Sequence, residues 1–516
     1  MTRLDNADVA QYYYGTCDLF LARKVLPIGE ANTYGTTVVT MLRATLLVSL
    51  AAAAVALPGG GSGRPDGAQG TLHDAALLES FSVGVRRELH QIPELLYGLK
   101  KTSAYVRAQL DKLHIPYQYP IAGEGIVATI GTGKSPCVGL RADMDALPIH
   151  EADDTGCTFR SKHDGKMHAC GHDVHTTMLL TAGRMLKERE SEIEGTVKLI
   201  FQPAEEGGAG GLMMVQEGVM TAEPRIERAF AMHVWPGATS GEIVGTPGVI
   251  MAAAGFYHIK MHGHGGHAAM PHTTIDPFTC VAAALSGIQT IVARNVDPLE
   301  SGVISNTFVN GGSAYNVIPP WVEMGGTIRS LSREGYRFLE ERLRAVVEGA
   351  AALGQCRLEL TMSSLDDDCK DHRVPPGAPG ACTFPPTINT KAAYALARGA
   401  AAELAGVDNV FDTAPTMAGE DFAYFLEKVP GAMMFLGIGN ASLGTNVNLH
   451  HPRFQMDESQ MKLGAALHVE MALRSLATPV ARGCGGAAAT ATDEEMQGSA
   501  ASHAQCAEGT YIEMED

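Results

Sequence analysis

Short apolar stretches alternate with helix-period segments through the first half of the chain, and this alternation restricts the possible folds more than any other feature. Strands that alternate with helices are typical of an α/β domain with a largely parallel sheet. The same pattern returns near the end, with a helix expected at 390–404, a strand at 432–437 and a helix at 458–476. In the first half, strands are expected at 126–130, 137–140, 196–201 and 228–232, and helices at 77–89, 174–187 and 210–218.

A block with a different order of predicted strands and helices interrupts this pattern from about Ala254 to residue 363. Its predicted elements follow the order β-α-β-β-α-β, which is the order of a ferredoxin-like unit. The expected strands are 256–262, 303–309, 321–328 and 357–362, and the expected helices are 276–293 and 332–353. We therefore expect an α/β catalytic domain with a mostly parallel sheet, formed by residues 74–253 and 364–477, with a ferredoxin-like domain inserted at 254–363.

The two ends of the chain differ in composition from this core. Residues 1–73 form an N-terminal extension in which 41–57 resembles a secretory signal, because a basic start precedes a short apolar run and small residues. A signal at that position implies translation from Met41, and an uncleaved anchor or an Ala-rich helix are the alternatives. The Gly-rich stretch 58–70 is expected to be a flexible linker, and 478–516 a disordered tail rich in small and acidic residues. We favour the secretory pathway over the cytoplasm.

The overall composition limits the kind of protein that this chain can be. Its 516 residues are 45% hydrophobic and 19% charged, and its formal net charge is -18. A chain so acidic lacks the clustered basic surface that nonspecific binding to nucleic acid or to anionic membranes requires. A soluble enzyme that acts on small molecules is expected, with no stable membrane partner.

The ten cysteines are scattered and show neither zinc-finger spacing nor that of a disulfide framework. Most are expected to be buried as small apolar residues. Cys369 and Cys382 flank a Pro/Gly-rich segment, 366–382, which looks like a surface insertion. These two could pair in a secreted protein.

Polar residues follow several of the predicted strands. Asp143 and Asp145 come after 137–140, Glu205 and Glu206 after 196–201, and His233 after 228–232. In open α/β sheets ligands bind beyond the carboxyl ends of the strands, so these side chains are expected to converge.

The segment M-H-A-C-G-H-D-V-H, residues 167–175, concentrates a thiol and three imidazoles. Cys170 and His172 are separated by Gly171, which lets the backbone bend so that both side chains face one centre. A thiolate is a good ligand for zinc or a related ion and can bridge two of them. The alternative, a buried cysteine beside capping residues, fits this density of ligands poorly.

Two further segments add candidate groups. Glu205 and Glu206 are adjacent on an extended segment, so one carboxylate can bind metal while the other handles protons. In H-H at 450–451, the residues alone do not say which imidazole turns inward.

The inserted block offers three more candidates. His267 could stabilise an oxyanion, and Asn316 and Arg329 could bind a substrate carboxylate. The alternatives are that His267 belongs merely to a Gly-rich loop and that Arg329 is merely a solvated arginine.

A series of motifs between Asp74 and Leu476 resembles a known family. The series is R-A-D-M-D-A-L-P-I, M-H-A-C-G-H-D-V-H, F-Q-P-A-E-E-G, M-H-V-W-P, G-H-G-G-H-A-A-M-P-H, N-V-I-P, G-T-I-R, M-A-G-E-D-F and L-H-H-P-R-F. It is similar to the amidohydrolase branch of the dinuclear metallopeptidases, which includes plant auxin-conjugate (indole-3-acetyl-amino acid) hydrolases, bacterial hippurate hydrolases and N-acyl-amino acid amidohydrolases.

The resemblance implies a set of roles for the matching residues. Glu205 is implied as the general acid/base, and a homodimer formed through the inserted lid would let His267 complete an active site, often the partner's. The wider family has an H-x-D pair where this chain has Asp143-Met144-Asp145, so that histidine's role does not transfer. Asp145 is expected to orient a ligand, and Asp173 to support the site. The implied ligands of two divalent ions are Cys170, His172, Glu206, His233 and His450.

These assignments predict metal-dependent hydrolysis of the amide bond of N-acyl amino acids, with Arg329 or Asn316 holding the free carboxylate. A dipeptidase or aminopeptidase of the same family is the alternative, and a noncatalytic acyl-amino acid binding protein is a third possibility. The acyl group and the metal stay open, since manganese, zinc and cobalt all accept such mixed ligands.

Overall fold

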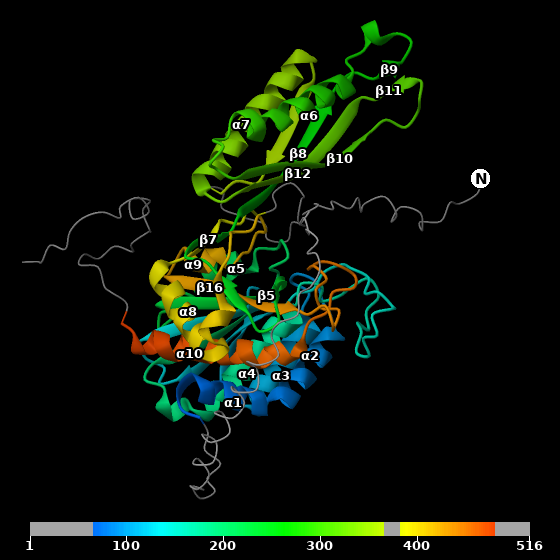
Figure 1. Ribbon diagram of the computed structural model, residues 1–516. Helices are drawn as coiled ribbons and strands as arrows, with labels where there is room; N and C mark the ends of the chain where they lie inside the picture. The colour runs from blue at the N-terminus through cyan, green and yellow to red at the C-terminus, as the bar shows by residue number, and fades with distance from the viewer. Residues whose placement is uncertain (1–64, 366–381, 480–516) are drawn as a thin grey trace, which may run out of the picture. The chain divides into compact units, whose positions relative to one another are not determined.

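The computed structural model describes residues 65–365 and 382–479 (Figure 1). The candidate signal at 41–57, the first part of the Gly-rich linker, almost all of the 366–382 insertion and the tail from 480 onwards lie outside the described residues. Within the described ranges, no helix is long and apolar enough to cross a membrane.

A large mixed sheet forms the centre of the α/β domain. Strands β4, β3, β5 and β16 run parallel to one another, in that order. The outer pairs β1–β2, β2–β4 and β16–β6 are antiparallel, and β15 runs parallel to β6. The strands in sheet order are β1 Tyr117–Ile121, β2 Gly125–Gly131, β4 Thr196–Gln202, β3 Cys137–Asp143, β5 Arg228–Thr239, β16 Gly431–Gly439, β6 Ile243–Gly245 and β15 Val410–Asp412.

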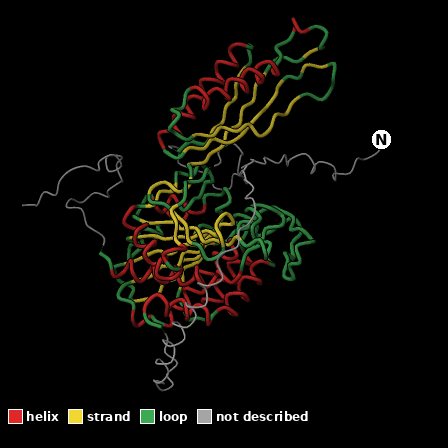
Figure 2. The backbone as a smooth tube through the Cα atoms, in the orientation of Figure 1, coloured by secondary structure: helices red, strands yellow, loops and turns green. Residues whose placement is uncertain are grey.

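Both faces of the central strands are buried, which explains why these strands are largely apolar. In β5, Phe230 and Met232 face one core while Ala229 and Ala231 face another, as the two-residue period of a strand requires. Figure 2 shows helices gathered along one side of these strands. That layer consists of α1 Gly67–Leu77, α2 Glu79–His90, α3 Lys100–Lys112, α4 His172–Glu188, α8 Lys391–Ala405 and α10 Met461–Ala477; the short helices α5 Gly210–Gln216 and α9 Ala423–Leu426 cover the other face.

The beginning of the domain differs from the sequence expectation. Helix α1 starts at Gly67, within the segment expected to be a flexible linker and before residue 74, the expected start of the catalytic domain. Ala68, Gly70 and Thr71 are buried, and α1 packs on α10. The small residues that resemble a linker therefore allow a close helix–helix contact instead.

The inserted segment forms its own sheet and core. Its four strands lie in the order β10-β12-β8-β13, every neighbouring pair is antiparallel, and α6 and α7 pack on the sheet. A small ribbon, β9 with β11, extends from it, and β7 pairs with β14 in the catalytic domain. The bounds are β7 Gly248–Met251, β8 Ala253–His262, β9 Gly266–His267, α6 Pro277–Arg294, β10 Gly302–Gly311, β11 Val317–Ile318, β12 Trp321–Ser330, α7 Arg333–Leu353, β13 Arg357–Met362 and β14 Thr387–Asn389.

The cysteine expectation needs one correction. Cys280 of α6 and Cys356, which precedes β13, form a disulfide, with their Cα atoms 6.6 Å apart. Residues 76 positions apart carry no short-range spacing signal, so only the packing of α6 against α7 identifies the pair. Cys369 lies outside the described residues, and its pairing with Cys382 stays a prediction.

Candidate metal centre

Three neighbouring parallel strands bring the polar side chains together. Asp143 ends β3, and Asp145 follows it. Glu205 and Glu206 lie just past the end of β4, and His233 lies within β5, which continues to Thr239. The convergence expected from the strand ends is present in the structure.

A left-handed glycine places the thiol and the first imidazole. Gly171 has φ 89° and precedes α4, whose first residue is His172. A Cβ at residue 171 would lie 2.5 Å from Cγ2 of Val234, so a larger residue would displace the neighbouring strand. Glycine therefore lets Cys170 and His172 approach β5 closely.

The Cys170 sulfur lies between two imidazoles. Its Sγ is 3.3 Å from Nε2 of His233 and 3.2 Å from Nε2 of His450. The same nitrogen of His450 lies 3.4 Å from Oε1 of Glu206. His451 instead accepts a hydrogen bond from the Arg453 backbone amide through Nδ1, so His450 is the imidazole that turns inward.

His172 is buried among carboxylates. Its Nε2 lies 3.7 Å from Asp143, 3.8 Å from Glu206 and 3.9 Å from Glu205. Its Nδ1 lies 3.5 Å from Asp145. Burial alone would lower the pKa of His172, but the surrounding carboxylates, Asp143 foremost, raise this pKa to about 10. The site concentrates negative charge around a buried imidazole.

These residues fit a pair of divalent ions. Both ring nitrogens of His172 and Oε1 of Glu206 are buried and have no hydrogen-bond partner among the residues that the structure describes, and such groups are costly unless something satisfies them. Cys170, His172 and His233 form one group whose ligand atoms lie within 4.8 Å of one another, and Cys170, Glu206 and His450 form a second. Cys170 belongs to both groups, and thiolate, imidazole and carboxylate together suit zinc-class ions.

The carboxylate of Asp145 fixes the glutamate pair. It accepts hydrogen bonds from the backbone amides of Glu205, at 3.0 Å, and Glu206, at 3.1 Å. It therefore orients both glutamates, and its Oδ1 lies 3.5 Å from Nδ1 of His172.

Asp143 orients a different histidine. Its Oδ1 lies 2.7 Å from Nδ1 of His175, whose Nε2 accepts a hydrogen bond from the Val234 amide. This chain links β3, α4 and β5 beneath the ligand groups.

Asp173 supports the centre from the other side of α4. Its Oδ2 accepts from Nε of Arg86 at 3.0 Å and lies 2.8 Å from Nδ1 of His90. These contacts tie the first turn of α4 to α2, next to His172.

The sequence motifs suggested no role for one buried network of ion pairs and hydrogen bonds at the site. The guanidinium of Arg141 is 1% exposed and contacts Asp143 at 2.8 Å, Glu420 at 2.9 Å and Asp421 at 2.9 Å. Its Nε also donates to Gln202. The motifs R-A-D-M-D, F-Q-P-A-E-E and M-A-G-E-D-F contain these residues, but nothing in them says that they meet.

Glu205 faces a cavity of about 460 Å³ beside the ligand groups. Burial raises the pKa of its carboxyl well above the usual range, and the negative charges of Glu420 and Glu206 add to this effect. A carboxyl group with a raised pKa can both accept and return a proton near neutral pH. Apolar side chains line much of the cavity, among them Trp235, Met251, Phe256 and Phe384.

The inserted domain contributes one cation to this cavity. Arg329 of β12 lines it and donates through Nη1 to the backbone oxygen of Met417. Burial lowers the pKa of Arg329, and none of the carboxylates in 65–365 and 382–479 forms an ion pair with it. An unpaired cation in a cavity is suited to an anionic ligand group.

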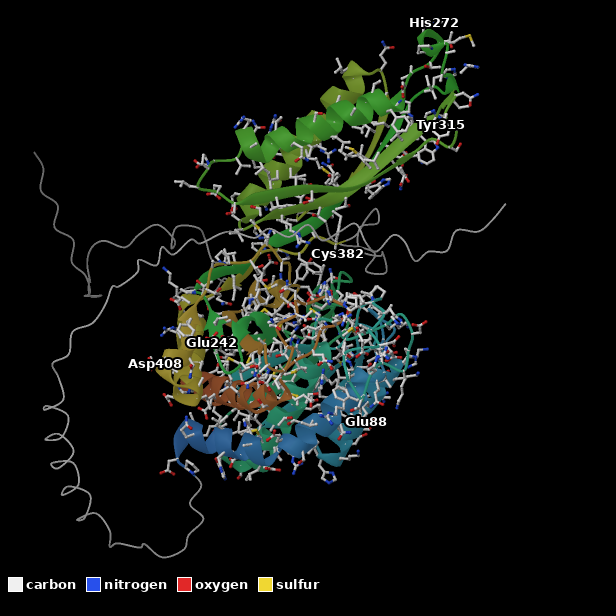
Figure 3. All side chains as sticks on the ribbon, turned by 45° about the vertical axis from the view of Figure 1, so that its right-hand side comes forward. Glu88, Glu242, His272, Tyr315, Cys382 and Asp408 are labelled. Carbon is white, nitrogen blue, oxygen red and sulfur yellow. A yellow bond between two sulfur atoms is a disulfide. The ribbon has the colours of Figure 1, made fainter. Side chains whose placement is uncertain are left out.

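His267 and Asn316 do not line the cavity. Both are exposed on the β9–β11 ribbon, where the Ala268 amide donates to the Asn316 backbone oxygen. Figure 3 places Tyr315, the neighbour of Asn316, and His272 at the same end of the inserted domain. The structure thus brings these two candidates together, but apart from the ligand groups of their own chain.

Comparison with known proteins agrees with this geometry. Residues 139–474 match the model of peptidase family M20/M25/M40. The chain belongs to this family. The M20 match begins in β3 and ends in α10, so it spans every residue of the ligand groups as well as the inserted domain.

Relatives within the M20 family include hydrolases of two kinds. The chain is 39% identical over 396 residues to IAA-amino acid hydrolase ILR1-like 4 of Arabidopsis thaliana, covering 77% of this chain and 86% of that protein. It is 37% identical over 402 residues to N-acetyl-L-cysteine deacetylase of Bacillus subtilis, covering 77% and 89%. The crystal structure of the B. subtilis YXEP protein, described as a dinuclear metal binding peptidase from M20 family, superposes with a TM-score of 0.64 at 31% identity, covering 78% and 99%.

Proposed function

We propose that this protein hydrolyses the amide bond of N-acyl amino acids in a metal-dependent reaction. The observation that carries the proposal is one cavity that is lined by the buried carboxyl of Glu205, by the guanidinium of Arg329 and by four of the candidate metal ligands, namely Cys170, Glu206, His233 and His450. An N-acyl amino acid has the matching parts, namely an amide, a free carboxylate and an acyl group. The apolar lining suits a bulky or aryl acyl group.

Two divalent ions would be held by Cys170, His172, Glu206, His233 and His450, with zinc, manganese and cobalt all compatible with this set. When bound, they supply Lewis acidity and lower the pKa of a water molecule in the site. Asp145 and Asp173 keep the ligand-bearing segments in place.

The remaining steps belong to side chains of the protein. Glu205 takes a proton from the attacking water and later delivers it to the leaving nitrogen. Arg329 holds the substrate carboxylate and so fixes the amide in position. The partner's His267 would donate a hydrogen bond to the carbonyl oxygen as negative charge develops there, because His267 does not line the cavity of its own chain.

Substrate preference tests this proposal. Steady-state assays would compare N-acetyl, N-benzoyl and N-indoleacetyl amino acids with free dipeptides, each with zinc, manganese or cobalt and after chelation. We expect turnover of the acyl amino acids, loss of that turnover on chelation, and a higher kcat/KM for the aryl acyl groups. A preference for free dipeptides would instead establish a peptidase. No turnover of either class with any ion would favour a noncatalytic acyl-amino acid binding protein.

Replacing the carboxylate-binding cation should affect binding more than chemistry. We expect Arg329→Gln to raise KM for an N-acyl amino acid by about 10- to 100-fold, the equivalent of one lost charged hydrogen bond, with a smaller change in kcat. An N-acyl amino acid amide, which lacks the carboxylate, should be hydrolysed equally by both forms. Equal KM values for the acid would remove Arg329 from substrate binding.

We further propose that the inserted domain is a ferredoxin-like lid that joins two copies, so that His267 and Asn316 reach the partner's cavity. Strand β10 is the edge of its sheet and offers unpaired backbone groups to a second strand. Exposed apolar side chains follow this edge and the adjoining ribbon, namely Phe308, Val309, Tyr315 and Val317. A patch of this kind is typical of an interface.

Subunit mixing tests the lid proposal. Glu205→Gln and His267→Ala should each be inactive alone, but a co-refolded mixture should regain about a quarter of wild-type activity, because each mixed dimer contains one complete site. No recovery in a mixture that demonstrably contains mixed dimers would refute a shared site.

Entry into the secretory pathway is our proposal for the location of the protein. The disulfide between Cys280 and Cys356 supports it, because such bonds persist in oxidising compartments. The expressed chain should be protected from added protease in sealed microsomes, and digestion there would favour the cytoplasm.

A further inference from the structure

A second group of metal-ligand side chains lies outside the proposed dinuclear site. His90, Glu151 and Cys157 each offer one ligand atom, and these three atoms lie within 4.8 Å of one another. His90 and Glu151 are buried, and Cys157 is a free, half-buried thiol. All three line a separate hollow of about 290 Å³ that shares no residue with the catalytic cavity.

The hydrogen bonds of His90 fix which of its nitrogens faces this group. Nδ1 lies 2.8 Å from Oδ2 of Asp173, and since a carboxylate only accepts, Nδ1 carries the proton. Nε2 points to Glu151, 3.3 Å from its Oε1. A histidine that donates Nδ1–H to a carboxylate and presents Nε2 is the arrangement found for metal-bound imidazoles.

Glu151 is held by the loop that also carries the thiol. Its Oε2 accepts from the Ser161 amide at 2.7 Å, and its backbone oxygen accepts from Arg160. This leaves Oε1 directed at His90. Residues 151–166 form neither helix nor strand, and the backbone hydrogen bonds that join this loop to other segments include those from the Ala152 amide to Pro452 and from the Lys162 amide to Gln91.

The charges around the group also suit a divalent ion. Arg86 and Arg87 are offset by Glu458, which contacts both, and by Asp173, which contacts Arg86. A thiolate at Cys157 and the carboxylate of Glu151 would then balance the two charges of the ion. His168 is also buried, and within 65–365 and 382–479 neither of its ring nitrogens has a hydrogen-bond partner; its ring centre lies 6.3 Å from that of His90.

We propose that His90, Glu151 and Cys157 form a mononuclear site for a zinc-class ion, with a fourth position open to the hollow. Imidazole, carboxylate and thiolate are the ligand types that zinc prefers, and three protein ligands leave room for water or a small anion. The ion would fasten the irregular 151–166 loop to α2. Through Asp173 the site contacts the helix turn that carries His172. Binding of the ion would therefore also affect the catalytic centre.

Zinc content of purified full-length variants tests this site. The protein would be equilibrated with zinc, freed of unbound ion and analysed by mass spectrometry for ions per chain. We expect Cys157→Ala to hold one ion fewer than wild type. The matched control is Cys137→Ala, which removes another free buried thiol that lies in neither site and should leave the zinc content unchanged. The difference of one ion does not depend on how many ions the catalytic centre holds.

A second measurement uses the unaltered chain and so does not depend on the folding of a variant. With free zinc at ten times its dissociation constant, alkylation of Cys157, mapped by peptide mass spectrometry, should slow about tenfold. Glu151→Gln should weaken this protection. Equal zinc content in wild type and Cys157→Ala, or unchanged labelling of Cys157 in zinc, would overturn the proposal.

Discussion

Glu205→Gln is expected to lower kcat for N-acyl amino acid hydrolysis by at least about 10³-fold, because general acid–base groups contribute up to about 10⁴-fold. Glutamine has nearly the same shape as glutamate but cannot take the proton from water. Burial raises the pKa of the Glu205 carboxyl well above its usual range, which is the direction that a proton carrier needs. The measurement is kcat together with metal content on the same preparation.

The metal content separates loss of the base from loss of the site. Glu205→Gln should keep its bound ions, because the proposed ligand is the neighbouring Glu206. Glu223→Gln is a suitable control, since Glu223 is exposed, forms an ion pair with Arg225 and does not line the cavity. Substantial amidase activity in Glu205→Gln would remove Glu205 as the base.

Arg141→Leu is expected to destabilise the fold by about 3–5 kcal/mol, the usual cost of removing one partner from a buried ion pair. The substitution leaves Asp143, Glu420 and Asp421 buried without their shared cation. Urea unfolding followed by circular dichroism would give the difference in the free energy of unfolding. Arg225→Leu is the matched control, because its ion pair is exposed and should contribute less than about 1 kcal/mol.

The effect of Arg141→Leu should depend on pH. Burial would raise the pKa of Asp143, but His172 and Arg141 outweigh it and hold this pKa well below its usual range. The stability that the ionised carboxylate contributes is therefore present above the usual pKa of aspartate and disappears as the pH falls through the lower folded-state value. The gap between wild type and Arg141→Leu should narrow in acid, and a gap below about 1 kcal/mol at neutral pH would contradict the role of Arg141.

Much of the fold follows from local sequence patterns. The predicted strands at 196–201 and 432–437 correspond to β4 and β16, and the predicted helices at 276–293 and 332–353 correspond to α6 and α7. The two strands are short, nearly continuous apolar runs, and the two helices carry a 3.6-residue apolar period over a sufficient length. The short strands β6 and β15 and the helix α1 were missed, because three-residue strands have no period to detect and α1 begins among glycines.

The sequence indicated some residues of the candidate site but not all of the contacts between them. Cys170, His172, Glu205 and Glu206 stand in dense local motifs, and the structure brings them together with His233 and His450. The sequence motifs could not show that Arg141 meets Glu420 and Asp421, about 280 residues later in the chain.

The sequence by itself indicated the types of candidate ligand, the strand ends that carry them and the segment in which the pattern of elements changes, because these depend on neighbours along the chain. Only the tertiary structure decided which imidazole of His450 and His451 turns inward, that Cys280 pairs with Cys356, and that His90 approaches Glu151 and Cys157. It also separated His267 from the cavity that Arg329 lines. The physical reason is that contacts between distant residues arise from the packing of strands and helices, which leaves no local pattern in the sequence.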